Sequence, residues 1–287
     1  MDSLVSVVTL THNKLEYTRL CLGSLLRTTY SPWELVVVDN GSTDGTREWL
    51  EEFRTTAGKS GVEVVVVPND SNTGCSTARN QGAERARGKR VVFMDNDVAL
   101  RSRGWLTELN ACLDRHADAG IAGPKLVYPF PPYAIQCAGA AVSPSGRIQF
   151  LGRGEPSDDP RFNAEREMQC LISACFMVTR PVINDTGGFD EAFNPVEYED
   201  IDLCYNARSK GYKVLYVPSV EMYHFENVTT EGTPKLANTY LIIKHGMLFK
   251  ERWSHVFRGE GGPPEEETKW RHIETRSLAE VEELPTI

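Results

Sequence analysis

Two aspartates follow an apolar run in the first half of the chain. In 93–100 (FMDNDVAL), Asp95 and Asp97 are separated by one asparagine, and apolar residues resume after them. Two carboxylates this close repel each other unless a cation or a hydrogen-bond network holds them. Mg²⁺ and Mn²⁺ bind oxygen ligands, commonly one or two carboxylates together with substrate phosphates and water. The pair therefore predicts part of a divalent-metal site for a phosphate-bearing ligand.

Small, polar or acidic residues follow three other apolar segments of the first half, namely TLTHN (9–13), DNGSTDG (39–45) and NDSNTG (69–74). In a parallel sheet, ligands bind beyond the carboxyl ends of the strands. Any single loop of this kind could be an ordinary turn, but four in succession predict one ligand-binding rim. No GxGxxG follows the first strand and no GxxxxGK[ST] occurs, which argues against a dinucleotide site and a P-loop.

These loops require strands and helices that bring them together. Strands are predicted at 4–10, 34–38, 62–67 and 90–94. Helices are predicted at 15–26, 46–53, 77–87 and 105–115. Short apolar strands that alternate with helices predict an α/β fold with a mainly parallel sheet and helices on both faces.

The second half has less regular patterns. We predict a strand at 121–128, a hairpin within 134–150, an apolar segment at 170–179, a helix at 199–210, a strand at 212–217 that ends before Pro218, and a helix at 236–257. Residues 152–167 are polar and rich in Gly, Pro and Asp, and we interpret them as a mobile loop that orders over the donor. The Pro- and Glu-rich C-terminal residues are predicted to form a tail or arm.

The composition limits the kind of ligand and the location. The formal net charge of −9 argues against a nucleic-acid partner, and an anionic substrate would need a local cation, an arginine or a helix N-terminus. No uncharged apolar run reaches the ~18 residues of a membrane span. The segment MDSLVSVVTLTHN lacks the features of a signal peptide, and the seven cysteines form no CxxC pair. We therefore predict a cytoplasmic protein.

The loop sequences together resemble a known family. TLTHN, VVVDNGSTDGT, NTGCSTARNQG and FMDNDV are similar to the first half of a family 2, GT-A-fold (Rossmann-like) nucleotide-sugar glycosyltransferase. GGFDE at 187–191, YED at 198–200 and His224 agree with the second half, so the resemblance covers about residues 4–250. It implies one domain at 1–255, with a nucleotide-binding half at 1–127 and an acceptor-binding half at 128–255, followed by a tail or arm at 256–287.

The resemblance also implies an activity. Members of this family transfer a sugar, with inversion, from a nucleoside-diphosphate donor (UDP, GDP or dTDP) to an acceptor hydroxyl, in the synthesis of polysaccharides, glycolipids or other glycoconjugates. A divalent cation, Mn²⁺ or Mg²⁺, assists because a diphosphate leaves poorly unless its charge is neutralised. The chain is thus predicted to be a hexosyltransferase-type enzyme. The donor sugar, the base and the acceptor do not follow from the sequence.

Several residues match family positions that hold the donor. Asp97 matches the metal-binding aspartate, Asp95 the residue near the ribose, and His224 a third contact to the metal or the diphosphate. Imidazole suits Mn²⁺ better than Mg²⁺, although a lone histidine after an apolar stretch is often structural. Asp39 resembles the aspartate that accepts a hydrogen bond from the base, or it caps the next helix. The resemblance assigns to the nucleotide, in addition, Thr9, Thr11, Asn13, Asn72, Gly74, Arg79 and Asn96.

Transfer with inversion needs one general base, which in the family pattern is the aspartate of the pair Glu199 and Asp200. Asp200 is therefore the predicted base, and Glu199 orients it or binds the acceptor. Acidic residues also favour the first turn of any helix, so a structural role stays open. Gly187 and Gly188 would let the backbone approach the donor sugar or acceptor closely. Arg79 has two open interpretations, a contact to base or phosphate and a surface ion pair.

Other functions fit part of the sequence. VVFMDNDVAL also resembles the first motif of haloacid-dehalogenase-like phosphatases, but that motif normally opens the chain, and here three strand–helix units precede it. A non-catalytic nucleotide-sugar-binding protein would keep the fold, although the complete set of acidic residues and His224 argues against it. Residues 241–258 mix apolar residues with Lys and Arg, so this helix either packs on the core or also contacts the inner face of a membrane. A homodimer is left open.

Overall fold

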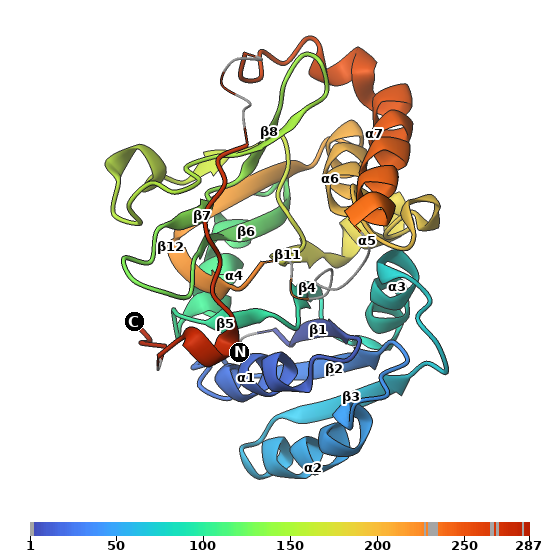
Figure 1. Cartoon of the computed structure of the whole chain (residues 1–287), viewed down its shortest axis with the longest axis vertical. Coiled ribbons are helices and arrows are strands. Elements are labelled where there is room, and N and C mark those ends of the chain that lie inside the picture. Colours follow the sequence, from blue (N-terminus) through green and yellow to red (C-terminus); the bar gives the residue numbers. More distant parts are fainter. Residues whose placement is uncertain (1–2, 227, 229–234, 265–266, 268–269, 283) are drawn as a thin grey trace.

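A computed structural model of the chain describes residues 3–226, 228, 235–264, 267, 270–282 and 284–287. The first half of the chain forms parallel strands in the spatial order β4-β1-β2-β3 (Figure 1). Their bounds are β1 (Val5–Thr11), β2 (Trp33–Asp39), β3 (Glu63–Pro68) and β4 (Arg90–Asp95). The helices that connect them are α1 (Leu15–Leu25), α2 (Thr46–Lys59) and α3 (Cys75–Arg85). The parallel half therefore matches the prediction closely.

The second half continues the same sheet with mixed strand directions. Strand β11 (Cys175–Thr179) lies antiparallel between β4 and β6 (Ala119–Val127), and β12 (Lys213–His224) runs parallel to β6. Three short strands pair antiparallel at its margins: β5 (Val98–Leu100) and β10 (Arg166–Glu167) with β12, and β7 (Ile135–Cys137) with β6. The sheet thus reverses direction at β11, where the two halves of the chain meet.

Helices cover both faces of this sheet. Successive side chains of a strand point to opposite faces, and Val7 and Val8 of β1 belong to different buried clusters. The cluster of Val7 contains residues of α1, α2 and α4 (Trp105–Arg115). The cluster of Val8 contains residues of α3, α5 (Arg180–Thr186), α6 (Glu199–Ser209) and α7 (Lys235–Phe257). The predicted arrangement of helices on both faces is confirmed.

Strand β12 corrects one prediction. The sequence predicts a strand that ends before Pro218, but β12 continues to His224. The pairing with β6 shifts register between Val217 and Glu221, and Pro218 lies inside this irregular stretch. Proline has no N–H to donate to a ladder and is tolerated at such irregularities. The extra residues matter because they bring His224 opposite Val98 of β5, a strand that the sequence did not reveal.

The predicted hairpin and loop also take more definite forms. The hairpin is formed by β8 (Ala140–Val142) and β9 (Ile148–Phe150), whereas β7 joins the main sheet. The segment 152–167 contains a short 3₁₀ turn, Pro160–Phe162, and Lys125 of β6 donates a hydrogen bond of 2.7 Å to the carbonyl oxygen of Ser157. Its closure over a donor stays a prediction.

The residues after α7 form an arm that runs back across both halves of the protein, drawn in red in Figure 1. The backbone N–H of Leu278 donates to the Tyr17 hydroxyl of α1 at 3.1 Å, and Tyr223 of β12 donates to the Pro285 carbonyl at 2.8 Å. Among the described residues, no helix has both the length and the apolar character needed to cross a bilayer. All seven cysteines are free thiols.

Candidate active site

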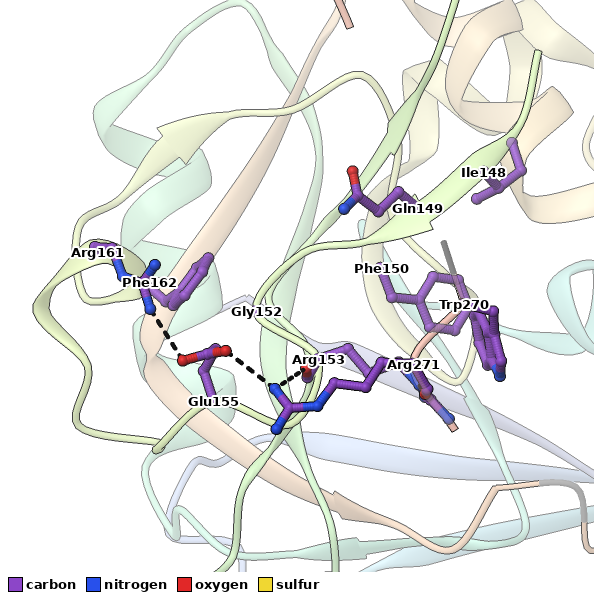
Figure 2. Close-up of a pocket in the computed structure, with 10 residues that line it drawn as sticks. All are labelled: Ile148, Gln149, Phe150, Gly152, Arg153, Glu155, Arg161, Phe162, Trp270 and Arg271. Carbon is purple, nitrogen blue, oxygen red and sulfur yellow. Dashed lines mark hydrogen bonds and ion pairs between the residues drawn. The ribbon is translucent and has the colours of Figure 1, made fainter. Parts of the chain in front are cut away.

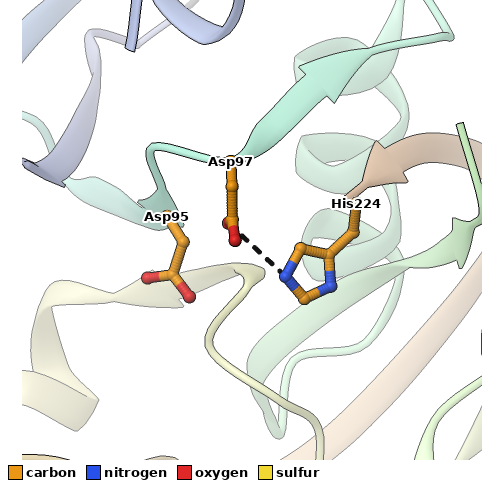
Figure 3. A group of neighbouring side chains, drawn as sticks. All are labelled: Asp95, Asp97 and His224. Carbon is orange, nitrogen blue, oxygen red and sulfur yellow. Dashed lines mark ion pairs between the residues drawn. The ribbon is translucent and has the colours of Figure 1, made fainter. Parts of the chain in front are cut away.

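Three predicted ligand residues come together where β4, β5 and β12 meet (Figure 3). Asp95 ends β4, Asp97 lies between β4 and β5, and His224 ends β12. Pairing of β12 with β5 sets their positions, and the next backbone N–H, of Phe225, donates to the Asp97 carbonyl at 3.1 Å. One ligand atom from each of the three side chains lies within 4.8 Å of the others. His224 Nε2 lies 3.4 Å from Asp97 Oδ1.

The charges in this group fit a divalent cation. Asp97 is 6% exposed, and its Oδ1 atom accepts no hydrogen bond within the described residues. Burial raises the pKa of Asp95, and the charge of Asp97 raises it further, against the opposing effect of Arg79. Burial alone would lower the pKa of His224, but the Asp97 and Asp95 carboxylates raise it. This set of two carboxylates and an imidazole, in which Asp97 is buried and the Asp95 side chain is 33% exposed, matches the ligands of Mn²⁺ better than those of Mg²⁺.

Gln136 of β7 orients the His224 ring. Its Oε1 atom lies 2.6 Å from His224 Nδ1, and the Gln136 side chain is completely buried. Because this amide oxygen can only accept, Nδ1 is the protonated nitrogen in this arrangement, and Nε2 is the atom that faces Asp97. Gln136 could not be singled out from the sequence, since a glutamine within a predicted hairpin has no signature of its own.

Arg79 of α3 joins the two predicted acidic pairs. Its guanidinium donates to Asp95 Oδ1 at 2.7 Å and to Glu199 Oε1 at 2.6 Å. The side chain is 3% exposed, so the interpretation as a surface ion pair is wrong. Burial opposes the charged form, but the surrounding anions, Asp95 first among them, raise the pKa of Arg79. The arginine therefore remains charged and holds the carboxylates of Asp95 and Glu199 in one site.

Asp200 lies in the first turn of α6 with its carboxylate fixed by backbone groups. The N–H of Ser173 donates to Oδ2 at 2.8 Å, and the N–H of Ile201 donates to Oδ1 at 2.7 Å. Burial, followed by the charge of Glu199, raises the pKa of Asp200 to about 7. A carboxylate with a pKa near the working pH is an effective general base, so the environment fits the predicted role.

Glu197, two residues before the acidic pair, is a further acidic group that the sequence did not single out. Glu197 and Tyr198 have φ angles of 85° and 72°, in the left-handed region that residues other than glycine rarely adopt. Such backbone is often found at functional sites. Burial, with the charges of Glu199 and Asp200, raises the pKa of Glu197 to about 7. Three carboxylates thus lie close together at the start of α6.

Asp39 ends β2 and is completely buried. Its Oδ1 accepts from the N–H of Ser42 at 3.0 Å, and its Oδ2 accepts from Arg47 Nε at 2.8 Å. Asp44 accepts from the N–H of Thr46 at 3.2 Å in the first turn of α2, which leaves Asp39 outside that role. The predicted contact of Asp39 with a base remains a prediction, because the carboxylate here is paired with protein groups.

The other predicted nucleotide residues hold neighbouring loops together. Thr11 and Asn96 both bond to the Thr18 hydroxyl of α1, at 2.8 and 2.9 Å. Asn13 Oδ1 accepts from the N–H of Thr43 at 2.8 Å. Thr9 is buried, and its hydroxyl has no hydrogen-bond partner among the described residues. These contacts fix the ends of β1, β2 and β4 relative to each other.

The three glycines that were predicted to lie near a ligand all have positive φ angles. Gly74 is followed by α3, and its N–H donates to Asn72 Oδ1 at 2.9 Å. Gly187 ends α5 with a φ of 79°. A Cβ atom on Gly188 would lie 2.5 Å from Asn80 Oδ1 of α3. The close approach predicted for a ligand at Gly188 is therefore made by Asn80, and ligand contact at these glycines stays a prediction.

Comparison with known proteins places the chain in a family. The model of "Glycosyl transferase family 2" matches residues 6–183, which is more than half of the chain. The chain belongs to glycosyl transferase family 2. The family 2 match includes Arg79, Asp95 and Asp97 and ends before Asp200 and His224. It removes the haloacid-dehalogenase-like phosphatase as an alternative.

Curated relatives of this family 2 protein differ in length. It is 31% identical over 240 residues to the uncharacterized protein y4gI of Sinorhizobium fredii, covering 81% of this chain and 26% of the relative. It is 32% identical over 124 residues to the putative teichuronic acid biosynthesis glycosyltransferase TuaG of Bacillus subtilis, covering 43% and 48%. An N-acetylglucosaminyl-diphospho-decaprenol L-rhamnosyltransferase of Mycobacterium tuberculosis is 28% identical over 260 residues, with 82% and 80% covered. The chain thus spans half or less of two of these relatives.

Solved structures of glycosyltransferases share the GT-A fold of this family 2 chain. GalNAc-T7 with UDP, GalNAc and Mn²⁺ superposes with a TM-score of 0.65 at 18% identity, covering 77% of this chain and 44% of that one. The mannosyltransferase PcManGT from Pyrobaculum calidifontis, with GDP-Man and Mn²⁺, gives 0.57 at 18% identity, covering 90% and 72%. S. aureus TarS 1–349 with UDP-GlcNAc gives 0.60 at 18% identity, covering 85% and 65%. At this identity the similarity concerns the fold alone.

Proposed function

We propose that this protein is an inverting glycosyltransferase that moves a sugar from a nucleoside-diphosphate donor to an acceptor hydroxyl in polysaccharide or glycoconjugate synthesis. The observation that supports it most is the buried bridge from Asp95 through Arg79 to Glu199. It joins the candidate metal ligands to the pair Glu199 and Asp200, of which Asp200 has a raised pKa, in one continuous site. The relatives named for teichuronic acid synthesis and for rhamnosyl transfer support the same class of reaction.

Residues 1–127 form the donor half in this proposal. Asp39 selects the base, Asp95 binds near the ribose, and Thr9, Thr11, Asn13, Asn72, Gly74 and Asn96 shape the rim. Asp97 and His224 would hold a divalent cation, with Mn²⁺ preferred because one ligand is an imidazole. The ion, when bound, would neutralise charge on the diphosphate. The Mn²⁺, UDP and GDP-Man of the similar solved structures support this choice of cofactor and donor.

Residues 128–255 form the acceptor half, and Asp200 acts as the base. As the acceptor oxygen bonds to the anomeric carbon, the bond from that carbon to the diphosphate breaks, and Asp200 takes the hydroxyl proton. Attack opposite the leaving group inverts the anomeric centre. Glu199, fixed by Arg79, keeps the start of α6 in place, and Gly187 and Gly188 shape the loop before it.

The proposed location is the cytoplasm, with contact to the inner face of a membrane through α7. This helix exposes Tyr240, Ile243 and Met247, which are 65%, 57% and 67% exposed and recur at helical spacing beside Lys244. An apolar face flanked by lysine suits an anionic lipid surface.

The test is a screen of UDP-, GDP- and dTDP-sugars for Mn²⁺-dependent hydrolysis, in the wild type, in Asp200→Asn and in the exposed control Asp185→Asn. Loss of the general base should reduce turnover by about 100-fold or more. Nucleotide binding, followed by thermal shift, should be unchanged, and the control should behave as the wild type. Unchanged turnover in Asp200→Asn would move the base elsewhere. Nucleotide binding without turnover on any donor or acceptor would indicate a binding protein instead.

A further inference from the structure

A pocket lies outside the acidic site, between β9, the segment 152–162 and the C-terminal arm (Figure 2). Its volume is about 250 Å³, and Phe150, Arg153, Glu155, Trp270 and Arg271 are among the residues that line it. Drug-sized ligands commonly occupy about 300–1,000 Å³. This pocket therefore suits one ring of a larger molecule, or a small ligand.

The charged side chains of this pocket are paired with one another. Arg153 makes a bidentate contact to Glu226, at 2.8 and 3.0 Å. Glu155 accepts from both Arg161 and Arg271, each at 3.0 Å, as Figure 2 shows. A phosphate or nucleotide would have to break these pairs to bind. Arg161 also pairs with a further carboxylate, Asp159, at 2.7 Å, so the three arginines face three carboxylates. The pocket thus offers many hydrogen-bonding groups without an excess charge, which favours a neutral polar ligand.

Aromatic surface and an unpaired acceptor complete the pocket. Trp270 is 55% exposed, and the Phe150 ring packs edge-on against it with ring centroids 5.2 Å apart. The Arg153 guanidinium lies 3.9 Å from the Trp270 ring centroid, which orients the indole. Gln149 Oε1 is buried without a hydrogen-bond partner among the described residues. Aromatic rings pack on the C–H faces of sugars, while amides, carboxylates and guanidinium groups bond to sugar hydroxyls.

The pocket is linked to the candidate active site through two strands. Ile135 of β7 exchanges backbone hydrogen bonds with the pocket loop, from its N–H to the Glu155 carbonyl at 2.8 Å and from the Gly154 N–H to its carbonyl at 2.7 Å. The next residue, Gln136, binds His224. Glu226, the partner of Arg153, follows His224 by two residues. A molecule in this pocket therefore lies against the same backbone segments that position His224 of the candidate metal site.

We propose that this pocket binds a neutral sugar ring of the acceptor, next to the ring that receives the transferred sugar. This inference rests on the proposed function, and it assigns a substrate class, a saccharide acceptor, to the acceptor half. Trp270 brings the C-terminal arm into acceptor recognition, and Gln149 and Glu155 bond to the hydroxyls.

Saturation-transfer NMR on the full chain with Mn²⁺ and UDP tests this, with the methyl glycosides of glucose, galactose, rhamnose and N-acetylglucosamine as probes. At least one glycoside should bind to the wild type and to Tyr240→Ala, which removes an equally exposed aromatic ring from α7. Trp270→Ala should weaken that binding about tenfold, equivalent to about 1.4 kcal/mol for an aromatic contact. No binding by any glycoside, or equal binding by both variants, would overturn the proposal.

Glu155→Gln is a second variant that keeps the pocket shape and leaves Arg161 and Arg271 without their shared carboxylate. It should shift preference from the neutral glycoside toward methyl glucuronide. Displacement of the glycoside from the wild type by inorganic phosphate would contradict a neutral-sugar site. Donor hydrolysis is measured in parallel. If the wild type hydrolyses no donor, the result counts against the proposed function. If Trp270→Ala still hydrolyses the donor and binds the glycoside as the wild type does, the result counts only against this pocket.

Discussion

The two halves of the sheet place their functional side chains in different ways. In the parallel half, polar residues follow each strand directly, so Asp39 and Asp95 reach one rim by strand alignment alone. In the mixed half, His224 reaches its position because β12 pairs with β5 across a long stretch of sequence. Gln136 lies on β7, which pairs with its sequence neighbour β6, but it contacts His224, 88 residues away. The first arrangement depends on local pattern, and the second depends on register between distant segments.

Arg79 connects these two arrangements, and its loss should have the largest effect. Arg79→Met would leave the buried Glu199 and the 33%-exposed Asp95 side chain without a counter-charge, so the free energy of unfolding should fall by about 3–5 kcal/mol. Urea unfolding measures it. Arg54→Met is the matched control, because Arg54 pairs with Glu51 at an exposed site, with both side chains more than half exposed. If both variants lost the same free energy of unfolding, the contacts of Arg79 with Asp95 and Glu199 would not stabilise the fold beyond an exposed ion pair.

Removal of the Gln136 acceptor tests the register-dependent half. Gln136→Leu keeps the side chain buried but frees His224 Nδ1, so affinity for Mn²⁺ should fall by about 10–100-fold. The electron paramagnetic resonance signal of free Mn²⁺ reports this without any substrate. Gln136→Glu retains an acceptor oxygen and should restore binding. Similar affinities in all three proteins would show that Gln136 only fills space.

Two carboxyl groups, Asp44 from the first half and Asp200 from the second, should respond to pH in opposite senses. Burial opposes ionisation at Asp44, but hydrogen bonds from Thr46 and Leu15 lower its pKa. Burial raises the pKa of Asp200 from 3.8 to about 7. Turnover should therefore fall about tenfold for each pH unit below 7, because the base becomes protonated. A turnover profile that is flat between pH 5 and 7 would exclude Asp200 as the base.

The same shift predicts a stability change of defined sign. A carboxyl whose pKa is higher in the folded state than in the unfolded state makes the folded protein bind the extra proton. The contribution of Asp200 to the free energy of unfolding should be complete below about pH 4 and lost as the pH rises through about 7. Urea unfolding across this range, compared with Asp200→Asn, measures the difference.

Packing in the parallel half gives the smallest effects. A Cβ atom on Gly82 of α3 would lie 2.3 Å from the Val8 side chain, so Gly82→Ala should destabilise by about 1–3 kcal/mol. A Cβ atom on Gly23 of α1 would meet nothing within 4 Å, so Gly23→Ala should stabilise by about 0.5–1 kcal/mol. Thermal unfolding compares the pair. If both substitutions changed the stability in the same direction, α3 would not pack as closely on β1 as described.

The sequence predicted the parallel half well because each strand there is a continuous apolar run followed by turn residues. It missed β5 because three residues give too short a pattern, and β5 forms only by pairing with the distant end of β12. Pro218 was taken as a stop because proline usually ends a ladder, whereas the register shift accommodates it. These errors share one cause, since long-range pairing overrides local pattern.

The candidate site shows the same division. Asp95, Asp97 and His224 were assigned by resemblance, and the structure brings them together. Gln136 and Glu197 could not be found from residue type, because their importance comes from neighbours that the chain supplies elsewhere. Arg79 was singled out, but its burial between two acidic pairs follows only from its long-range contacts with Asp95 of β4 and Glu199 of α6.

The C-terminal arm has a consequence for motion between the halves. It bonds to Tyr17 and Arg101 in the first half of the chain and to Tyr223 in the second half. A hinge motion that separates the halves would therefore have to break the hydrogen bonds of the C-terminal arm to at least one of them. Substrate entry and product exit are expected to proceed through rearrangement of surface loops, while the sheet and the C-terminal arm move together as a single rigid body.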